Sequence, residues 1–117
     1  MPDRAWKAEE RAVARLLAGA RCPANSGGRV DVIGPGIVAQ VKHVRTCSLA
    51  RLEAIAVEMA ALGQQHGGAG VVMVKRRAGR GQPTPRLIIM TDRVWRHLAR
   101  PPLNPGQPSI AQHHKEQ

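Results

Sequence analysis

Residues 30–42 read VDVIGPGIVAQVK, and this stretch predicts the centre of the fold. Two runs rich in aliphatic residues, Arg29 to Ile33 and Ile37 to Lys42, flank a Gly-Pro-Gly sequence at residues 34–36. This pattern is typical of two antiparallel strands joined by a tight turn. With Pro35 and Gly36 at the centre of the turn, Asp31 is expected directly opposite Gln40.

Polar residues gather on one face of this predicted hairpin. Side chains alternate along a strand, so Lys42 is expected on the same face as Gln40 and Asp31. The opposite face is expected to carry the aliphatic residues Val30, Val32, Ala39 and Val41. An acid, an amide and a lysine brought together in this way are costly unless the face is a functional site.

The chemistry of these side chains suits a hydrolytic metal centre. The Asp31 carboxylate and the Gln40 amide oxygen are donors of the kind that Mg²⁺ prefers, and the Val41 backbone carbonyl is an expected further ligand. Lys42 is placed to orient or deprotonate an attacking water and to stabilise negative charge on a phosphate. A second acid is expected from Glu9 or Glu10, and periodicity alone does not choose between them.

Apolar periodicity predicts the remaining elements. We expect a helix from Arg4 to Leu17 with Trp6, Val13, Leu16 and Leu17 on its apolar face, and a short strand between Ala20 and Ala24. A second helix is expected from Ser48, its N-cap, to Leu62, with an apolar face of Leu49, Leu52, Ile55, Met59 and Leu62. Strands at Gly70–Arg76 and Arg86–Thr91 and a helix at Asp92–Arg100, carrying Val94, Trp95 and Leu98, complete the list.

These elements predict one α/β domain at residues 1–100, a small mixed β-sheet flanked by helices in the order αβββαββα. Residues 101–117 contain many prolines and few apolar residues, which predicts a disordered C-terminal tail. The chain has two Trp and no Phe or Tyr, so its core is expected to be aliphatic. The two Cys residues and the lack of a long apolar run predict a cytoplasmic protein with reduced thiols and no membrane contact.

The net charge of +10, from 18 Lys and Arg against 8 Asp and Glu, predicts a partner that carries phosphate. A surface kept soluble by charge is the alternative explanation. The scarcity of aromatic residues argues against reading bases by stacking and favours recognition of the backbone.

The order of these motifs resembles the PD-(D/E)XK nuclease superfamily, and within it the archaeal-type and phage Holliday junction resolvases. The likeness runs from about Trp6 to Trp95. Glu9-Glu10-Arg11 resembles the Ala-Glu-Arg element of the family's first helix, and Asn25-Ser26-Gly27-Gly28 resembles its Ser-Gly loop. Val30-Asp31 resembles the family's Val-Asp, and Gln40-Val41-Lys42 stands where its Glu-Val-Lys stands, as in relatives of the Mrr-type restriction nucleases.

The resemblance implies a restriction-endonuclease-like core and a Mg²⁺- or Mn²⁺-dependent endonuclease that cuts four-way DNA junctions as a homodimer, without a small-molecule cofactor. It selects Glu10 as the helix acid, so that the catalytic residues are Glu10, Asp31, Gln40 and Lys42, and the metal ligands are Glu10, Asp31, Gln40 and Val41. Expected DNA contacts come from Arg11, Ser26, Arg29, His43, Arg45, Lys75, Arg76 and Arg77. The alternatives are a restriction- or repair-type endonuclease on duplex or flap DNA, and a protein that binds junctions with little or no cleavage.

Overall fold

The structure, a computed structural model, describes residues 5–22 and 29–100. The first half of this part contains α1 (Ala5–Leu16), β1 (Ala20–Arg21), β2 (Val32–Gly34) and β3 (Ile37–Val44). The second half contains α2 (Leu49–Gln65), β4 (Ala69–Arg76), β5 (Arg86–Ile89) and α3 (Asp92–Leu98). This order confirms the predicted α/β fold, although most element bounds differ from the prediction by one to three residues.

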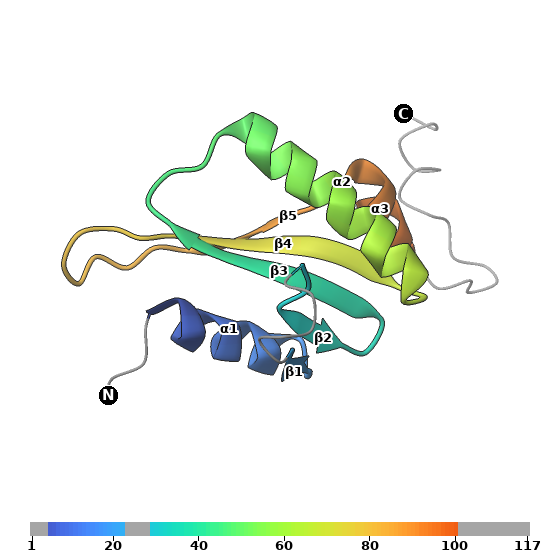
Figure 1. Ribbon diagram of the computed structural model, residues 1–117, viewed down its shortest axis with the longest axis horizontal. Helices are drawn as coiled ribbons and strands as arrows, with labels where there is room; N and C mark the ends of the chain where they lie inside the picture. Colours follow the sequence, from blue (N-terminus) through green and yellow to red (C-terminus); the bar gives the residue numbers. More distant parts are fainter. Residues whose placement is uncertain (1–4, 23–28, 101–117) are drawn as a thin grey trace, which may run out of the picture.

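The strands form one mixed sheet in the order β1-β2-β3-β4-β5 (Figure 1). β3 and β4 are parallel and are connected through α2, whereas the other neighbouring strands are antiparallel. Because β3 and β4 are parallel, both end at the same side of the sheet. From there the connection between β4 and β5 extends beyond the helices (Figure 1).

The predicted turn between β2 and β3 is confirmed. Gly34 pairs with Ile37, so Pro35 and Gly36 are the two central residues. Gly36 has a φ of 71°, a conformation that glycine adopts without strain. The register continues to Val32 opposite Ala39.

Beyond Val32 the hairpin departs from simple alternation. The Asp31 amide donates a hydrogen bond of 2.9 Å to the carbonyl of Ala39, which is also the register partner of Val32. Two successive residues, Asp31 and Val32, therefore lie opposite one residue of β3, Ala39, and this arrangement is a β-bulge. As a result Val30 packs against the residues under α2, and the prediction that Val30 shares a face with Val32 is wrong.

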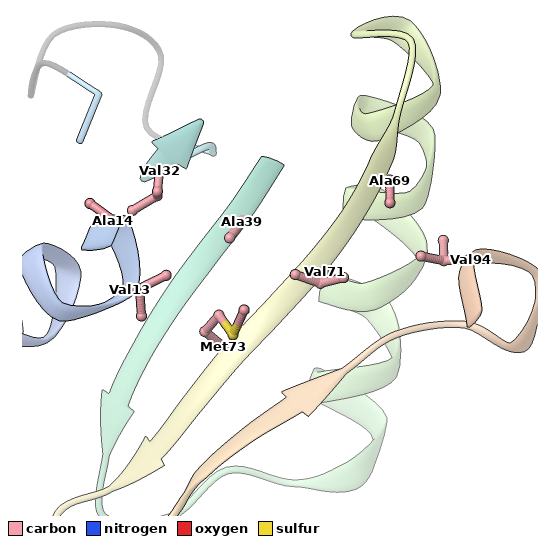
Figure 2. Packing of buried hydrophobic residues seen from close by; sticks show 8 residues of the cluster. All are labelled: Val13, Ala14, Val32, Ala39, Ala69, Val71, Met73 and Val94. Carbon is pink, nitrogen blue, oxygen red and sulfur yellow. The ribbon is translucent and has the colours of Figure 1, made fainter. Parts of the chain in front are cut away.

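Two aliphatic clusters lie on opposite faces of the sheet. The α1-side core consists of Val13, Ala14, Val32, Ala39, Ala69, Val71, Met73 and Val94, contributed by α1, β2, β3, β4 and α3 (Figure 2). The α2-side core consists of Val38, Ile55, Ala56, Met59, Val72 and Val74. Odd-numbered residues of β3 and β4 thus face α1, and even-numbered residues face α2.

Several apolar residues expected in the core lie at the surface instead. Trp6 is 43% exposed and Trp95 57%, so neither Trp fills the core. Leu16 and Leu98 are also exposed, and Leu49 at the start of α2 is 81% exposed. Apolar periodicity marks a helix face but not how much of that face a neighbouring element covers, so these positions were predicted to be more buried than they are.

α2 lies unusually close to β4, and glycine makes this possible. A Cβ atom at Gly70 would overlap the carbonyl oxygen of Met59, and one at Gly63 would overlap the backbone of Gly70.

α2 begins as predicted at Ser48, whose hydroxyl accepts a 3.1 Å hydrogen bond from the Arg51 amide. No helix within residues 5–22 and 29–100 is long and apolar enough to cross a membrane. The predicted tail at residues 101–117 lies outside the described residues.

Candidate functional site

The Asp31 carboxylate lies at an open edge of β3. β2 pairs with β3 as far as Ala39, and no other described strand continues that side of β3 toward Val44. There the Val41 amide donates a 2.8 Å hydrogen bond to Asp31 Oδ2. The amide and carbonyl of one strand residue point to the same side, so the Val41 carbonyl is directed to this edge as well. An acidic side chain and a backbone carbonyl therefore meet where the two strands part.

The electrostatic surroundings of Asp31 are mixed. Burial raises the pKa of Asp31, and the negative charge of Glu10 raises it further. The hydrogen bond from Val41 and the positive charges of Lys42 and Arg21 act in the opposite direction. The net effect is a raised pKa, so a positive charge at this edge would favour the ionised carboxylate.

The two acids of α1 have different partners. Glu10 accepts from Arg21 of β1, with Nε at 3.0 Å and Nη2 at 2.9 Å from Oε1, and it acts electrostatically on Asp31. Glu9 instead accepts two hydrogen bonds from Arg86 of β5, at 2.6 and 2.9 Å. The structure thus brings Glu10, rather than Glu9, to Asp31.

Gln40 and Lys42 lie on the α2 face of β3, on either side of Val41. They alternate with Val41 on β3 and share their face with Val38, a residue of the α2-side core. Both are half-buried, and Lys42 lies near enough to influence the pKa of Asp31. The prediction of one shared face for Asp31, Gln40 and Lys42 is therefore wrong in detail: the bulge puts the Asp31 carboxylate beside the strand edge, between Glu10 on one face and Lys42 on the other.

These residues, called the edge site below, comprise Glu10, Asp31, Gln40, Val41 and Lys42. Their donors are two carboxylates, an amide oxygen and a backbone carbonyl, all hard oxygen ligands that fit Mg²⁺ or Mn²⁺. Among the described residues no group of three His, Cys, Asp or Glu side chains could hold a metal. A metal here would therefore depend on Gln40 and Val41 as well as on the two acids.

Most of the predicted DNA-contacting residues gather where β3 and β4 end. His43 pairs with Lys75 and Val44 with Arg76, and the Arg77 amide donates to the Val44 carbonyl at 2.8 Å. Arg45 follows directly and is exposed. This end lies three residues beyond Lys42, about 10 Å along an extended strand.

The other predicted contacts are dispersed. Arg11 lies on α1 and is half-buried. Arg29 forms a 3.2 Å ion pair with Glu58 of α2, and both side chains are substantially exposed, so the pair adds little stability. Ser26 lies outside the described residues.

Sequence reasoning missed two neighbours of the edge site, Arg21 and Cys22. Arg21 pairs with Val32 across β1 and β2, and the Cys22 amide donates to the Asp31 carbonyl at 2.8 Å. Burial and the charges of Asp31 and Glu10 raise the pKa of the Cys22 thiol. A strand of two residues has no periodicity to detect, so only the pairing of β1 with β2 could reveal them. Comparison of the chain with known protein families, curated proteins and solved structures finds no match.

Proposed function

We propose that this protein is a metal-dependent DNA endonuclease of the PD-(D/E)XK type that cuts four-way junctions as a homodimer. The observation that carries the proposal is the Asp31 carboxylate beside the Val41 backbone at the open edge of β3. Glu10 lies near it on one side and Lys42 on the other. Resolving a four-way junction takes two symmetric cuts, which two identical subunits can provide.

In this proposal Glu10, Asp31, Gln40 and the Val41 carbonyl hold Mg²⁺ or Mn²⁺, which when bound polarises the scissile phosphate and acidifies a water. Lys42 orients that water and stabilises the added negative charge on the phosphate. The basic end formed by Arg45, Arg76 and Arg77 binds the backbone beside the cut. Arg21 contacts Oε1 of Glu10 and would compete with a metal for that oxygen.

Junction binding without cleavage is the second candidate, and one observation favours it. Gln40 supplies no charge, so the edge site contains only two carboxylates, of which Glu10 is already paired with Arg21. A site with this charge binds a divalent cation more weakly than a site with three acids. A restriction- or repair-type endonuclease on duplex or flap DNA would use the same edge site.

The test is a cleavage assay on a synthetic four-way junction with Mg²⁺ or Mn²⁺, with flap and duplex DNA in parallel. Lys42→Ala is expected to abolish paired symmetric nicks, whereas Arg51→Ala, which alters an exposed basic residue of α2, should cut like the wild type. Gln40→Glu restores the third acid and should increase the rate. Junction binding without cutting by the wild type, together with cutting by Gln40→Glu, would identify a binding protein. Equal cutting by wild type and Lys42→Ala would contradict the proposed site.

A further inference from the structure

A cavity separate from the edge-site residues lies beside the first turn of α1. It has a volume of about 400 Å³ and is lined by Ala5, Trp6, His43 and Arg77. His43 is an odd-numbered residue of β3, so the cavity lies on the α1 face, at the carboxyl ends of β3 and β4. It is called the Trp6 cavity below.

The cavity contains an exposed indole ring, a surface for stacking that the scarcity of aromatic residues in the sequence had argued against. The chain contains two Trp, Trp6 and Trp95, and no Phe or Tyr, and the Trp6 side chain is 43% exposed. The Lys7 ammonium lies over the Trp6 ring, 5.5 Å from its centre, so a base would stack on the opposite ring face. A flat aromatic ring with cations around it is the arrangement on which proteins stack unpaired bases.

The charge around the cavity favours a phosphate. Arg77 lines it, and Lys75 is the register partner of His43, another lining residue. Glu9, which interacts electrostatically with His43 and Lys75, is paired with Arg86 through two hydrogen bonds. The local excess of positive charge therefore remains available to an anion.

His43 forms part of the cavity wall. Its Nδ1 atom is buried and has no hydrogen-bond partner among the described residues. Because Nδ1 is inaccessible to solvent, it lies beneath the cavity wall and does not itself face the cavity. The ring of His43 thus lies in the cavity wall without a structural hydrogen bond at this atom.

We propose that the Trp6 cavity binds one unpaired nucleotide of a DNA substrate, with the base stacked on Trp6 and the phosphate held by Arg77 and Lys75. The inference rests on the proposed function in that the ligand is DNA. Trp6 precedes Glu10 by four residues, about 6 Å along a helix. This separation is short on the scale of a DNA strand, so the cavity would select substrates with a base unpaired close to the phosphate that is cut.

The test compares equilibrium binding to two fluorescent DNA probes in buffer with a metal chelator, so that no cleavage occurs. One probe is a blunt duplex and the other is the same duplex with a single-stranded thymidine overhang. Wild type is expected to bind the overhang probe more tightly. Trp6→Ala should weaken overhang binding about 10-fold and blunt-duplex binding less than about 2-fold, since one stacked base is lost. Trp95→Ala removes the other exposed Trp and should behave like the wild type.

Trp6→Leu keeps an apolar side chain on α1 but has no aromatic face, and it should lose the overhang preference with an unchanged circular dichroism spectrum. The proposal is overturned if Trp6→Leu and Trp6→Ala bind both probes as the wild type does, or if they weaken both probes equally. The two proposals fail separately: a wild type that prefers the overhang but cuts no junction contradicts the nuclease function alone. A wild type that cuts junctions through Lys42 but shows no Trp6-dependent preference contradicts the nucleotide cavity alone.

Discussion

Replacing Arg86 by alanine should destabilise the fold by about 3 kcal/mol at neutral pH, because it leaves a buried carboxylate without its partner. Arg86 of β5 donates two hydrogen bonds to Glu9 of α1, and the two side chains are 26% and 6% exposed. The magnitude is taken from the lower end of the range for broken buried pairs, since Arg86 keeps contact with water. The pair also holds α1 in place, and with it Glu10, the next residue.

The destabilisation caused by Arg86→Ala should decrease as the pH falls. Burial alone would raise the pKa of Glu9, but the hydrogen bond and charge of Arg86, with Lys75 and His43, lower it below the ordinary value of 4.5. In the wild type this stabilisation is present above pH 4.5 and is lost as the pH falls through the lowered folded pKa. In Arg86→Ala burial dominates, so the pKa of Glu9 rises and protonation stabilises the variant. The difference between the two proteins should therefore shrink on acidification toward pH 4.5.

Urea unfolding followed by circular dichroism at pH 7 and pH 4.5 measures this difference. Arg96→Ala is the matched control, because it breaks an exposed pair with Asp92 and should leave the unfolding midpoint unchanged. A free energy of unfolding for Arg86→Ala within about 0.5 kcal/mol of the wild type at pH 7 would contradict a stabilising Arg86–Glu9 pair. So would a loss of stability that is the same at both pH values. If Arg86→Ala does not fold at pH 7, a cooperative unfolding transition should reappear at pH 4.5, where protonation of Glu9 removes the unpaired charge.

Three further outcomes are expected. Met59→Ala, at a fully buried position of the α2-side core, should cost about 2–5 kcal/mol in urea unfolding, whereas Leu49→Ala at the exposed start of α2 should cost less than about 0.5 kcal/mol. Gly70→Ala should destabilise the fold by about 1–3 kcal/mol or more, the cost of overpacking, because its methyl group would overlap the Met59 carbonyl. In the same assay Gly79→Ala should be neutral, because its methyl group would meet no atom within 4 Å. Because the pKa of Asp31 is raised above its ordinary value of 3.8, calorimetry should show that Mn²⁺ binding weakens on acidification before the pH reaches 3.8, and Asp31→Asn should remove that contribution. Wild-type affinity that stays constant down to pH 3.8 would contradict it.

The local signals of the sequence predicted most of the architecture. Pro35-Gly36 between two aliphatic runs indicated the hairpin, and its register is confirmed from Gly34 to Val32. Ser48 marked the start of α2, where its hydroxyl caps the helix. These features depend on a few neighbouring residues, so the sequence pattern carries them directly.

Other features arise from contacts between distant segments. The bulge at Asp31 turns Val30 toward α2, and no periodicity in a short strand reveals such an insertion. The acids of α1 were indistinguishable from spacing, but their partners, Arg86 for Glu9 and Arg21 for Glu10, separate them. Whether a given Trp is buried also depends on the extent of the element that covers it.

The sequence by itself thus determined the order of the elements, the mixed α/β class, the β2–β3 turn and the strongly basic character of the protein. Local backbone preferences and composition are sufficient for these properties. Only the tertiary structure decided which acid meets Asp31, that the Asp31 carboxylate lies beside the Val41 backbone, and that Trp6 borders a basic cavity. Each of these depends on where β1, β5 and α1 lie relative to β3, and that arrangement is set by the packing of the whole domain.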